Sequence, residues 1–388
     1  MTSTPPPTCD PTSLIRPEVR RLRAYHVEAP DPARIRAKLD ANESPFALGD
    51  HVRTELAAEL ATALADVELH RYPDPQAQEL RRLLAADLGV SAEQVLATNG
   101  SDEGIQILLQ AVAGPDTAVA IPVPTFAMYE LGARVHGLRV VAVPLDAAFD
   151  LDLAAFRAAL RAERPRLVFL AWPNNPTARL YGREAVETIV RACGGGDCGA
   201  LVVVDEAYVH YSGQSVLDRL AEYPHLVVLR TLSKVGLAGI RLGMIIAQPA
   251  VLAELNKVRL PYNVNALSQA AARVVLRHPG VVRQHAATIV RERDRVLAAL
   301  QRMAGLTVFP SGANFILMRV NGSGGSGGPG GSGGSGEAVW RALLAQGVLV
   351  RNFSRAPHLA ECLRVTIGTP EENDLFLQAL GAVLAAGG

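Results

Sequence analysis

The chain has few lysine, cysteine and aromatic residues, and it carries no excess charge of either sign. Its 388 residues include four cysteines, 5% aromatic residues and 38 acidic against 38 basic side chains. A formal net charge of zero argues against binding nucleic acid or an anionic membrane through bulk charge. The scattered cysteines do not form a disulfide framework, which makes a reducing compartment the default. We therefore expect a soluble globular protein that acts on small molecules.

Targeting signals and long apolar runs are also missing. The N-terminus, "MTSTPPPTCDPTSLIRP", is polar and proline-rich, and apolar runs such as "ALVVV" are far shorter than the roughly 20 residues that span a bilayer. Cys193 and Cys198 flank "GGGD" at a spacing wider than that of common zinc pairs, so we interpret them as loop cysteines and expect no metal. No G-x-G-x-x-G follows a first strand, which disfavours a nicotinamide oxidoreductase. These absences predict a cytoplasmic protein.

Lysine is the scarcest basic residue, and one lysine has an unusual setting. Only Lys38, Lys234 and Lys257 are present, so almost every cation is arginine. Lys234 follows the apolar run "HLVVLRTLS" and precedes the Gly/Ala-rich "VGLAGIRLG". Unlike arginine, lysine can lose its proton near neutral pH and attack a carbonyl as a primary amine. The alternative interpretation is a solvated lysine at a strand end.

The middle of the sequence alternates β-branched runs with segments of helical period, which indicates βαβ units and a largely parallel sheet. Strand-like "RLVFLAW", "ALVVV" and "HLVVLR" are followed by "PNNPT", "DEAY" and "TLSK". Asn175, Asp205 and Lys234 are therefore 30 and then 29 residues apart, about one βα repeat each time. Ligands of open parallel sheets bind outside the carboxyl ends of the strands. The spacing predicts that these three side chains surround one crevice.

The pattern changes after about residue 275. A long charged helix is expected through "IVRERDRVLAALQRM", followed by the strands "NFILMRV", "GVLVRNF" and "CLRVTIG" and a terminal helix. We expect a large cofactor-binding domain over residues 51–275 and a small domain over 276–388, which residues 1–50 join. Residues 322–336, "GSGGSGGPGGSGGSG", are expected to form a flexible surface loop in the small domain.

The groups near Lys234 suit pyridoxal 5′-phosphate (PLP). A lysine that forms an imine needs an electron sink, and PLP supplies one if its ring nitrogen stays protonated. Asp205 could hold that proton, since an opposing carboxylate raises such a pKa by about one to three units. Tyr208 and Asn175 could donate hydrogen bonds to the cofactor's phenolate oxygen. The alternatives are a helix N-cap for Asp205, a packed tyrosine and an asparagine in an ordinary turn.

The cofactor's phosphate also has candidate donors. "NGSDE" opens a helix and offers the backbone N–H groups of Ser101 and Asp102 together with the helix dipole. Ser233 and Arg241 add a hydroxyl and a guanidinium on either side of the lysine. Phe126 of "PTFAMY" could stack on a pyridine ring. A capped helix start and a core phenylalanine are the alternatives.

Nine motifs in order give the chain a family resemblance: "LDANESPF", "RYPD", "NGSDE", "PTFAMY", "PNNPT", "DEAY", "TLSKVGLAGIRLG", "NFILMR" and "LRVTIG". The chain resembles the fold-type-I PLP-dependent aminotransferases, and among them the histidinol-phosphate aminotransferase family. The resemblance implies an α/β fold with a large domain, built on a mostly parallel seven-stranded sheet flanked by helices, and a smaller α+β domain. It also implies a homodimer with shared active sites, in histidine biosynthesis.

The same resemblance implies a reaction and a role for each site residue. The reaction is transfer of an amino group between L-histidinol phosphate and 2-oxoglutarate, giving imidazole acetol phosphate and glutamate. Lys234 would form the internal aldimine, Asp205 would face the pyridine nitrogen, and Tyr208 would reach the phenolate oxygen. The other cofactor contacts would be Asn175, Phe126, Ser101, Asp102, Ser233, Arg241 and, from the neighbouring subunit, Tyr72. The substrate contacts would be Tyr25, Asn42, Arg351, Arg364 and the neighbour's Tyr262.

The chain departs from the family pattern at three places. Ala178 stands where many members have glycine, and Phe126 replaces a frequent tyrosine. The loop from Lys234 to Arg241 is one residue shorter, which makes Arg241 the least secure phosphate ligand. An aromatic or broad-specificity aminotransferase and a threonine-phosphate decarboxylase-like enzyme remain open alternatives. A transcription regulator on the same fold is disfavoured, because the resemblance begins near Tyr25 and leaves no room for a helix-turn-helix.

Overall fold

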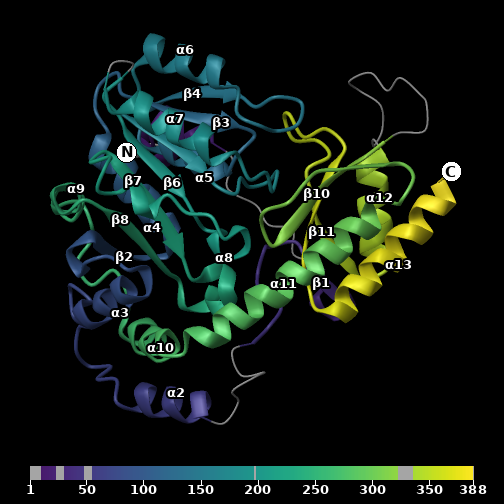
Figure 1. The fold of residues 1–388 in the computed structure, drawn as a ribbon, viewed down its shortest axis with the longest axis horizontal. Helices are drawn as coiled ribbons and strands as arrows, with labels where there is room; N and C mark the ends of the chain where they lie inside the picture. The colour runs from purple at the N-terminus through teal and green to yellow at the C-terminus, as the bar shows by residue number, and fades with distance from the viewer. Residues whose placement is uncertain (1–9, 23–29, 48–54, 196–197, 322–334, 388) are drawn as a thin grey trace, which may run out of the picture.

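The computed structural model describes residues 10–22, 30–47, 55–195, 198–321 and 335–387, which form two sheets with helices packed on them (Figure 1). The larger sheet has the order β2-β8-β7-β6-β5-β3-β4. Its strands are β2 (Val95–Asn99), β3 (Ala118–Val123), β4 (Arg139–Pro144), β5 (Leu167–Ala171), β6 (Leu201–Asp205), β7 (Leu226–Thr231) and β8 (Leu242–Ala247).

The larger sheet is mostly parallel. The pairs β3–β4, β3–β5, β5–β6 and β6–β7 are parallel, and β8 runs antiparallel to both β7 and β2. Its central strands are buried on both faces, which explains their unbroken Val/Leu runs. The fold class predicted from the sequence is confirmed.

Helices cover both faces of the larger sheet. One face packs against α4 (Gly100–Val112), α5 (Ala127–Val135) and α9 (Pro249–Leu255). The other packs against α3 (Gln78–Leu88), α6 (Leu153–Glu163), α7 (Arg183–Cys193) and α10 (Ala266–Leu276), and α2 (Glu55–Ala65) contacts α10. This double cover leaves the strand ends as the place where polar side chains gather.

The smaller sheet has the order β1-β11-β12-β10-β9. Its strands are β1 (Ala37–Leu39), β9 (Leu306–Val308), β10 (Phe315–Val320), β11 (Val348–Asn352) and β12 (Cys362–Thr366). They share a core with α8 (Val209–Ser212), α11 (Pro279–Leu300), α12 (Ser335–Ala345) and α13 (Pro370–Gly387). The long helix α11 runs from the larger sheet toward the smaller one (Figure 1).

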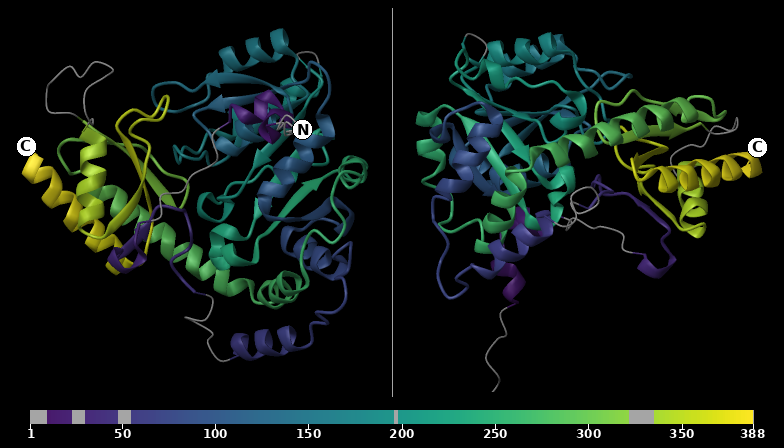
Figure 2. Two further views of the ribbon diagram at one scale, coloured as in Figure 1. Left: turned by 180° about the vertical axis from the view of Figure 1, so that it is seen from behind. Right: turned by 60° about the horizontal axis from the view of Figure 1, so that its bottom comes forward.

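The N-terminal segment contacts both parts of the molecule. β1 pairs in parallel with β11, whereas α1 (Pro17–Arg20) contacts α5 beside the larger sheet. Figure 2 shows this early segment on the side of the molecule that is hidden in Figure 1. Among the described residues of 1–50, β1 therefore joins the smaller sheet, whereas α1 contacts a helix of the larger one.

Short helical turns complete the described chain. They are η1 (Pro11–Leu14), η2 (Pro32–Arg34), η3 (Ala92–Gln94), η4 (Leu217–Arg219), η5 (Ser233–Leu237) and η6 (Ala238–Ile240). No helix in the described ranges is both long and apolar enough to cross a membrane.

Two local expectations need revision. Cys193 is not in a loop but is the last residue of α7, and both Cys193 and Cys198 are buried because their apolar side chains complete the core beside β6. Residues 335 and 336 of the expected loop at 322–336 belong instead to α12. Residues 322–334 lie outside the described residues.

Candidate active site

A cavity lies at the carboxyl ends of β5, β6 and β7, between the two sheets. It encloses about 870 Å³, its open mouth included. Twelve of the fifteen side chains predicted from the sequence line it: Asn42, Ser101, Asp102, Phe126, Asn175, Asp205, Tyr208, Ser233, Lys234, Arg241, Arg351 and Arg364. Tyr72 and Tyr262 do not line it, and Tyr25 lies outside the described residues. The spacing argument therefore predicted correctly that Asn175, Asp205 and Lys234 meet.

Lys234 is the only one of the three lysines that lines the cavity. It lies in η5, directly after β7, where Gly236 takes a φ of 97° and turns the chain. Its Nζ donates to the carbonyl oxygen of Ala41 at 3.5 Å. Burial, together with the positive charge of Arg364, lowers the pKa of Lys234 to about 8. A larger share of its amine is therefore neutral near physiological pH than in an ordinary lysine.

The other two lysines have ordinary surface settings. Lys38 is half exposed and pairs with Asp40 and Glu43, and Lys257 is exposed and pairs with Glu254. The pKa of Lys38 is raised, because its carboxylate partners outweigh partial burial. Lys234 is thus the lysine whose environment favours the neutral amine.

Asp205 ends β6 at the floor of the cavity and is buried. Its Oδ2 accepts a hydrogen bond from the Tyr129 hydroxyl at 2.7 Å, and its Oδ1 accepts one from the backbone N–H of Ala207 at 3.0 Å. Burial raises the pKa of Asp205 to about 6, and the two hydrogen bonds oppose that rise. The carboxylate is therefore oriented, and it is ionised at neutral pH despite its burial.

Tyr129 was missed by the sequence reasoning. It lies on α5, three residues after Phe126 in "PTFAMY", and it is fully buried. Helical spacing from a residue already expected at the cavity was the available signal. A buried tyrosine on an amphipathic helix is otherwise indistinguishable in sequence from a core residue.

The start of α4 forms a cradle for an anion. Gly100 has a φ of 75°, and a Cβ on Gly243 of β8 would come within 2.4 Å of the backbone nitrogen of Ser101. Only glycine at position 243 therefore lets β8 approach the helix start this closely. The helix N-terminus offers free N–H groups and a positive dipole end.

Arg241 closes this cradle from the other side. Its Nη1 donates to Ser233 Oγ at 3.4 Å, and its Nη2 pairs with Asp102 Oδ2 at 2.9 Å. Although the loop after Lys234 is short, the structure places the guanidinium beside the helix start, with Arg241 at a φ of 53°. A phosphate in the cradle would meet N–H groups, a hydroxyl and a guanidinium.

Two arginines on the smaller sheet reach the same cavity. Arg351 of β11 and Arg364 of β12 stand directly opposite each other in an antiparallel pair. Like charges in that register are unfavourable unless an anion lies between or beside them. Arg364 donates from Nη1 to Asn175 Oδ1 at 2.6 Å and from Nη2 to the carbonyl oxygen of Asp40 at 2.7 Å. Arg364 therefore connects the smaller sheet to the strand ends of the larger one.

The segment after β1 forms another wall of the cavity. Asn42 Nδ2 donates to the Tyr208 hydroxyl at 3.0 Å, and the backbone N–H of Asn42 donates to Thr366 Oγ1 at 2.9 Å. Asn42 also has a φ of 55°, a backbone conformation that asparagine tolerates better than most residues. These contacts hold Asn42 and Tyr208 in one network at the cavity wall.

Tyr72 and Tyr262 lie together on the surface. Their rings stack with centroids 4.5 Å apart, and Tyr72 is 80% exposed. Exposed leucines lie nearby in the sequence at Leu69, Leu260 and Leu267. None of these five side chains lines the chain's own cavity.

The donor set of the cavity fits PLP. An amine with a lowered pKa, an oriented carboxylate and an anion cradle at a helix start are the groups that the aldehyde, ring nitrogen and phosphate of PLP require. Phe126 lines the same cavity and offers an aromatic face.

Comparisons with known proteins agree with this arrangement. The family model of aminotransferase class I and II matches residues 35–380. The chain is 45% identical to histidinol-phosphate aminotransferase 2 of Cupriavidus pinatubonensis over 96% of each chain, and 44% identical to histidinol-phosphate aminotransferase 1 of Ralstonia nicotianae over 96% of this chain and 94% of the relative.

Solved structures extend the likeness to three dimensions. The histidinol-phosphate aminotransferase of Sinorhizobium meliloti, in complex with pyridoxal-5′-phosphate, has a TM-score of 0.81 at 25% identity, covering 95% of this chain and 97% of that one. The L-threonine-O-3-phosphate decarboxylase of Porphyromonas gingivalis has a TM-score of 0.74 at 26% identity, covering 90% and 99%.

Proposed function

Because the chain belongs to the aminotransferase class I and II family, we propose that it transfers an amino group between L-histidinol phosphate and 2-oxoglutarate, using PLP. The products are imidazole acetol phosphate and glutamate. One observation carries the proposal: Lys234 and Asp205 line the same cavity as the anion cradle and the Arg351–Arg364 pair. The names of the 45%- and 44%-identical relatives support this choice of substrate.

We propose the following cofactor contacts. Lys234 would hold the aldehyde carbon, Asp205 the ring nitrogen, Tyr208 and Asn175 the phenolic oxygen, and Phe126 the face of the ring. When bound, the ring withdraws the electron pair left on the substrate after its Cα proton is removed. The phosphate contacts are Ser101, Asp102, Ser233, Arg241 and, from a second copy of the chain, Tyr72.

Lys234 is the proposed acid–base group. A base is most effective when its pKa lies near the working pH, and burial brings the pKa of Lys234 to about 8. In the loaded protein, the Nζ of Lys234 would accept the proton from the substrate's Cα. The Nζ contacts the carbonyl oxygen of Ala41 at 3.5 Å, and both residues line the cavity.

Arg351 and Arg364 are the proposed anion-binding groups for both substrates. One substrate carries a phosphate monoester and the other a dicarboxylate, and a guanidinium pairs bidentately with either group. Asn42, Tyr25 and the second copy's Tyr262 complete the proposed pocket. The opposed arginines support this role, because a bound anion relieves their mutual repulsion.

We further propose a homodimer that covers the exposed apolar group of Leu69, Tyr72, Leu260, Tyr262 and Leu267. Exposed apolar groups of this kind commonly mark protein interfaces. A second copy placed there would carry Tyr72 and Tyr262 toward the opposite cavity.

We also retain the proposed division into residues 51–275 and 276–388. The sheet membership supports it, since β2–β8 form one sheet and β9–β12 belong to the other. We also propose a reducing, cytoplasmic location, which the small number of scattered cysteines supports.

A panel of amino donors assayed with 2-oxoglutarate tests the proposed reaction. Histidinol phosphate should exceed histidinol, phenylalanine and tyrosine in kcat/KM by orders of magnitude, because a donor without phosphate cannot make the phosphate–guanidinium contacts proposed for Arg351 and Arg364. Comparable rates with free aromatic amino acids would favour a broad-specificity aminotransferase. Release of CO₂ from threonine phosphate would favour a decarboxylase.

A further inference from the structure

Tyr129 touches two side chains expected to contact the cofactor ring. Its hydroxyl donates to Asp205 Oδ2 at 2.7 Å. Its ring meets Phe126 edge-on, with centroids 5.6 Å apart at 86°, and it stacks on Phe169 with centroids 4.5 Å apart at 6°. A buried tyrosine of the core is thus joined to the floor of the cavity and to one of its walls.

We propose that Tyr129 is a positioning residue that fixes the direction of the Asp205 carboxylate and the Phe126 ring toward the PLP ring. This proposal rests on the proposed function, because it assigns the cofactor to this cavity. Tyr129 acts through its two neighbours, and so it is not itself a catalytic residue.

The geometry at Asp205 explains how Tyr129 acts. A carboxylate can rotate about its Cβ–Cγ bond, and here each oxygen has its own donor, Tyr129 on Oδ2 and Ala207 N–H on Oδ1. With both donors in place, rotation breaks at least one hydrogen bond. Donors to a carboxylate also favour its ionised form, which opposes the effect of burial. Asp205 is consequently held in one orientation by two donors, which also oppose the rise of its pKa on burial.

The contact between Tyr129 and Phe126 likewise restricts a side chain that lines the cavity. Phe126 precedes the first residue of α5, and its carbonyl oxygen accepts the backbone N–H of Tyr129 at 3.2 Å. The edge-on ring contact restricts rotation of the Phe126 side chain. Phe169 of β5 stacks on the Tyr129 ring. The contact between Tyr129 and Phe126 is therefore supported by a strand of the larger sheet.

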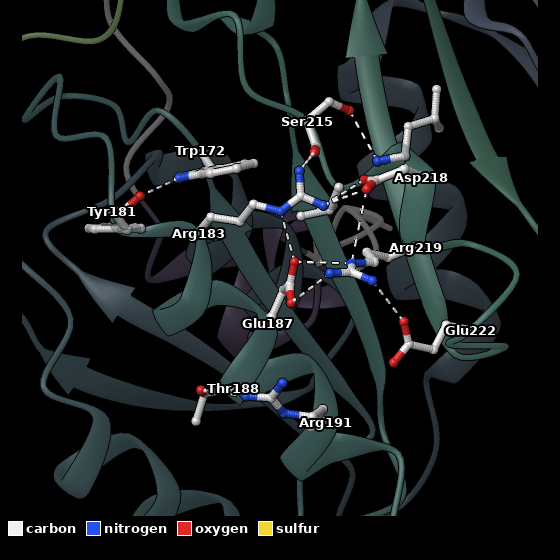
Figure 3. A network of polar contacts seen from close by, with 12 residues as sticks. Trp172, Tyr181, Arg183, Glu187, Thr188, Arg191, Ser215, Asp218, Arg219 and Glu222 are labelled. Atoms are coloured by element: carbon white, nitrogen blue, oxygen red, sulfur yellow. Dashed lines mark hydrogen bonds and ion pairs between the residues drawn. The ribbon is translucent and has the colours of Figure 1, made fainter.

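Tyr181 offers a matched control for removal of a buried hydroxyl. It is as fully buried as Tyr129, but its hydroxyl has no hydrogen-bond partner among the described residues, and it does not line the cavity. Figure 3 shows that the indole N–H of Trp172 reaches the backbone carbonyl of Tyr181, a bond that a phenylalanine there would keep.

The test measures the affinity of Tyr129→Phe, Tyr181→Phe and wild type for PLP and for an analogue with carbon in place of the ring nitrogen. The ratio of the two dissociation constants reports recognition of the ring nitrogen. We expect this ratio to favour PLP equally in wild type and in Tyr181→Phe. In Tyr129→Phe the ratio should be about tenfold smaller, which is the usual effect of losing one hydrogen bond to a charged group. An unchanged preference in Tyr129→Phe would overturn the proposal.

A second variant keeps the test decisive if Tyr129→Phe does not fold. Replacement of Tyr129 by 3-fluorotyrosine keeps the ring and makes the hydroxyl a stronger donor. The preference for PLP over the carbon analogue should then rise, whereas a fall or no change would contradict the proposal. If the wild-type protein itself fails to bind PLP, the proposed function is contradicted. Failure of the proposed function can therefore be distinguished from failure of the proposal about Tyr129.

Discussion

The cavity and the ion-pair network beside it use charged residues in opposite ways. In the network of Figure 3, Arg183 pairs with Glu187 at 2.8 Å and with Asp218 at 2.6 Å, and Arg219 pairs with Glu187 at 3.1 Å. The hydrogen bond from Arg183 is the main reason that the pKa of Glu187 is lowered, which favours its charged form. In the cavity, the pKa of Asp205 is raised and that of Lys234 is lowered, which favours their neutral forms.

The opposite pKa shifts in the two regions depend on whether a charged side chain has an ion-pair partner. Each charge of the network has an opposite charge within reach, whereas the described residues place no ion-pair partner on Asp205 or Lys234. A buried charge without a partner destabilises the folded protein, so sites that keep such groups commonly use them in chemistry. The ion pairs of the network join α7 to η4, and the unpaired groups of the cavity fit the proton transfer proposed for them.

The largest effect expected is from Lys234→Ala. It removes the proposed nucleophile and the proposed base together, so turnover should fall by about 10⁴-fold or more. The visible absorbance of the covalently bound cofactor should disappear as well. Lys257→Ala removes an exposed, paired lysine and is the matched control, with unchanged absorbance and rate. Normal transamination by Lys234→Ala would refute the assignment.

Asp205→Asn separates activity from stability. Turnover should fall roughly 10²-fold or more, because the ring nitrogen loses its charged partner. The cofactor-free variant should nevertheless gain stability relative to wild type as the pH rises.

The direction of this change in stability with pH follows from the raised pKa of Asp205. Folded Asp205 holds its proton up to about pH 6, while the unfolded residue loses it near 3.8, the ordinary pKa of an aspartate. The contribution of Asp205 to the free energy of unfolding is therefore full below about pH 4 and falls as the pH rises to about 6. Relative to wild type, Asp205→Asn should gain about 2–3 kcal/mol across this window, measured by urea unfolding. If the difference in free energy of unfolding between the variant and wild type does not change with pH, folding does not raise the pKa of Asp205.

Glu187→Gln tests the network side of the comparison and should have the smallest effect. The carboxylate bridges two partly exposed arginines, so its loss should lower the free energy of unfolding by at most about 1 kcal/mol. Cofactor affinity and kcat should match wild type, since Glu187 does not line the cavity. A large fall in kcat at unchanged melting temperature would contradict the claim that the network acts on stability and not on activity.

The sequence predicted the parts of the site that follow from strand periodicity. Asn175, Asp205 and Lys234 come at the ends of adjacent parallel strands, so their meeting needed no knowledge of side-chain packing. The contact of Tyr129 with Asp205 depends on how α5 is rotated against the sheet, which the sequence pattern does not specify. The register that opposes Arg351 and Arg364 likewise depends on the pairing of two strands joined by a loop.

Covalent trapping of the cofactor tests the central claim most directly, because the chain has only three lysines. Borohydride reduction of the PLP-loaded protein, followed by peptide mapping, identifies the lysine that carries the cofactor. The unpaired Lys234 should carry one cofactor per chain, while the paired Lys38 and Lys257 stay unlabelled. A label confined to Lys38 or Lys257, or a loaded protein with no label on Lys234, would contradict the claim.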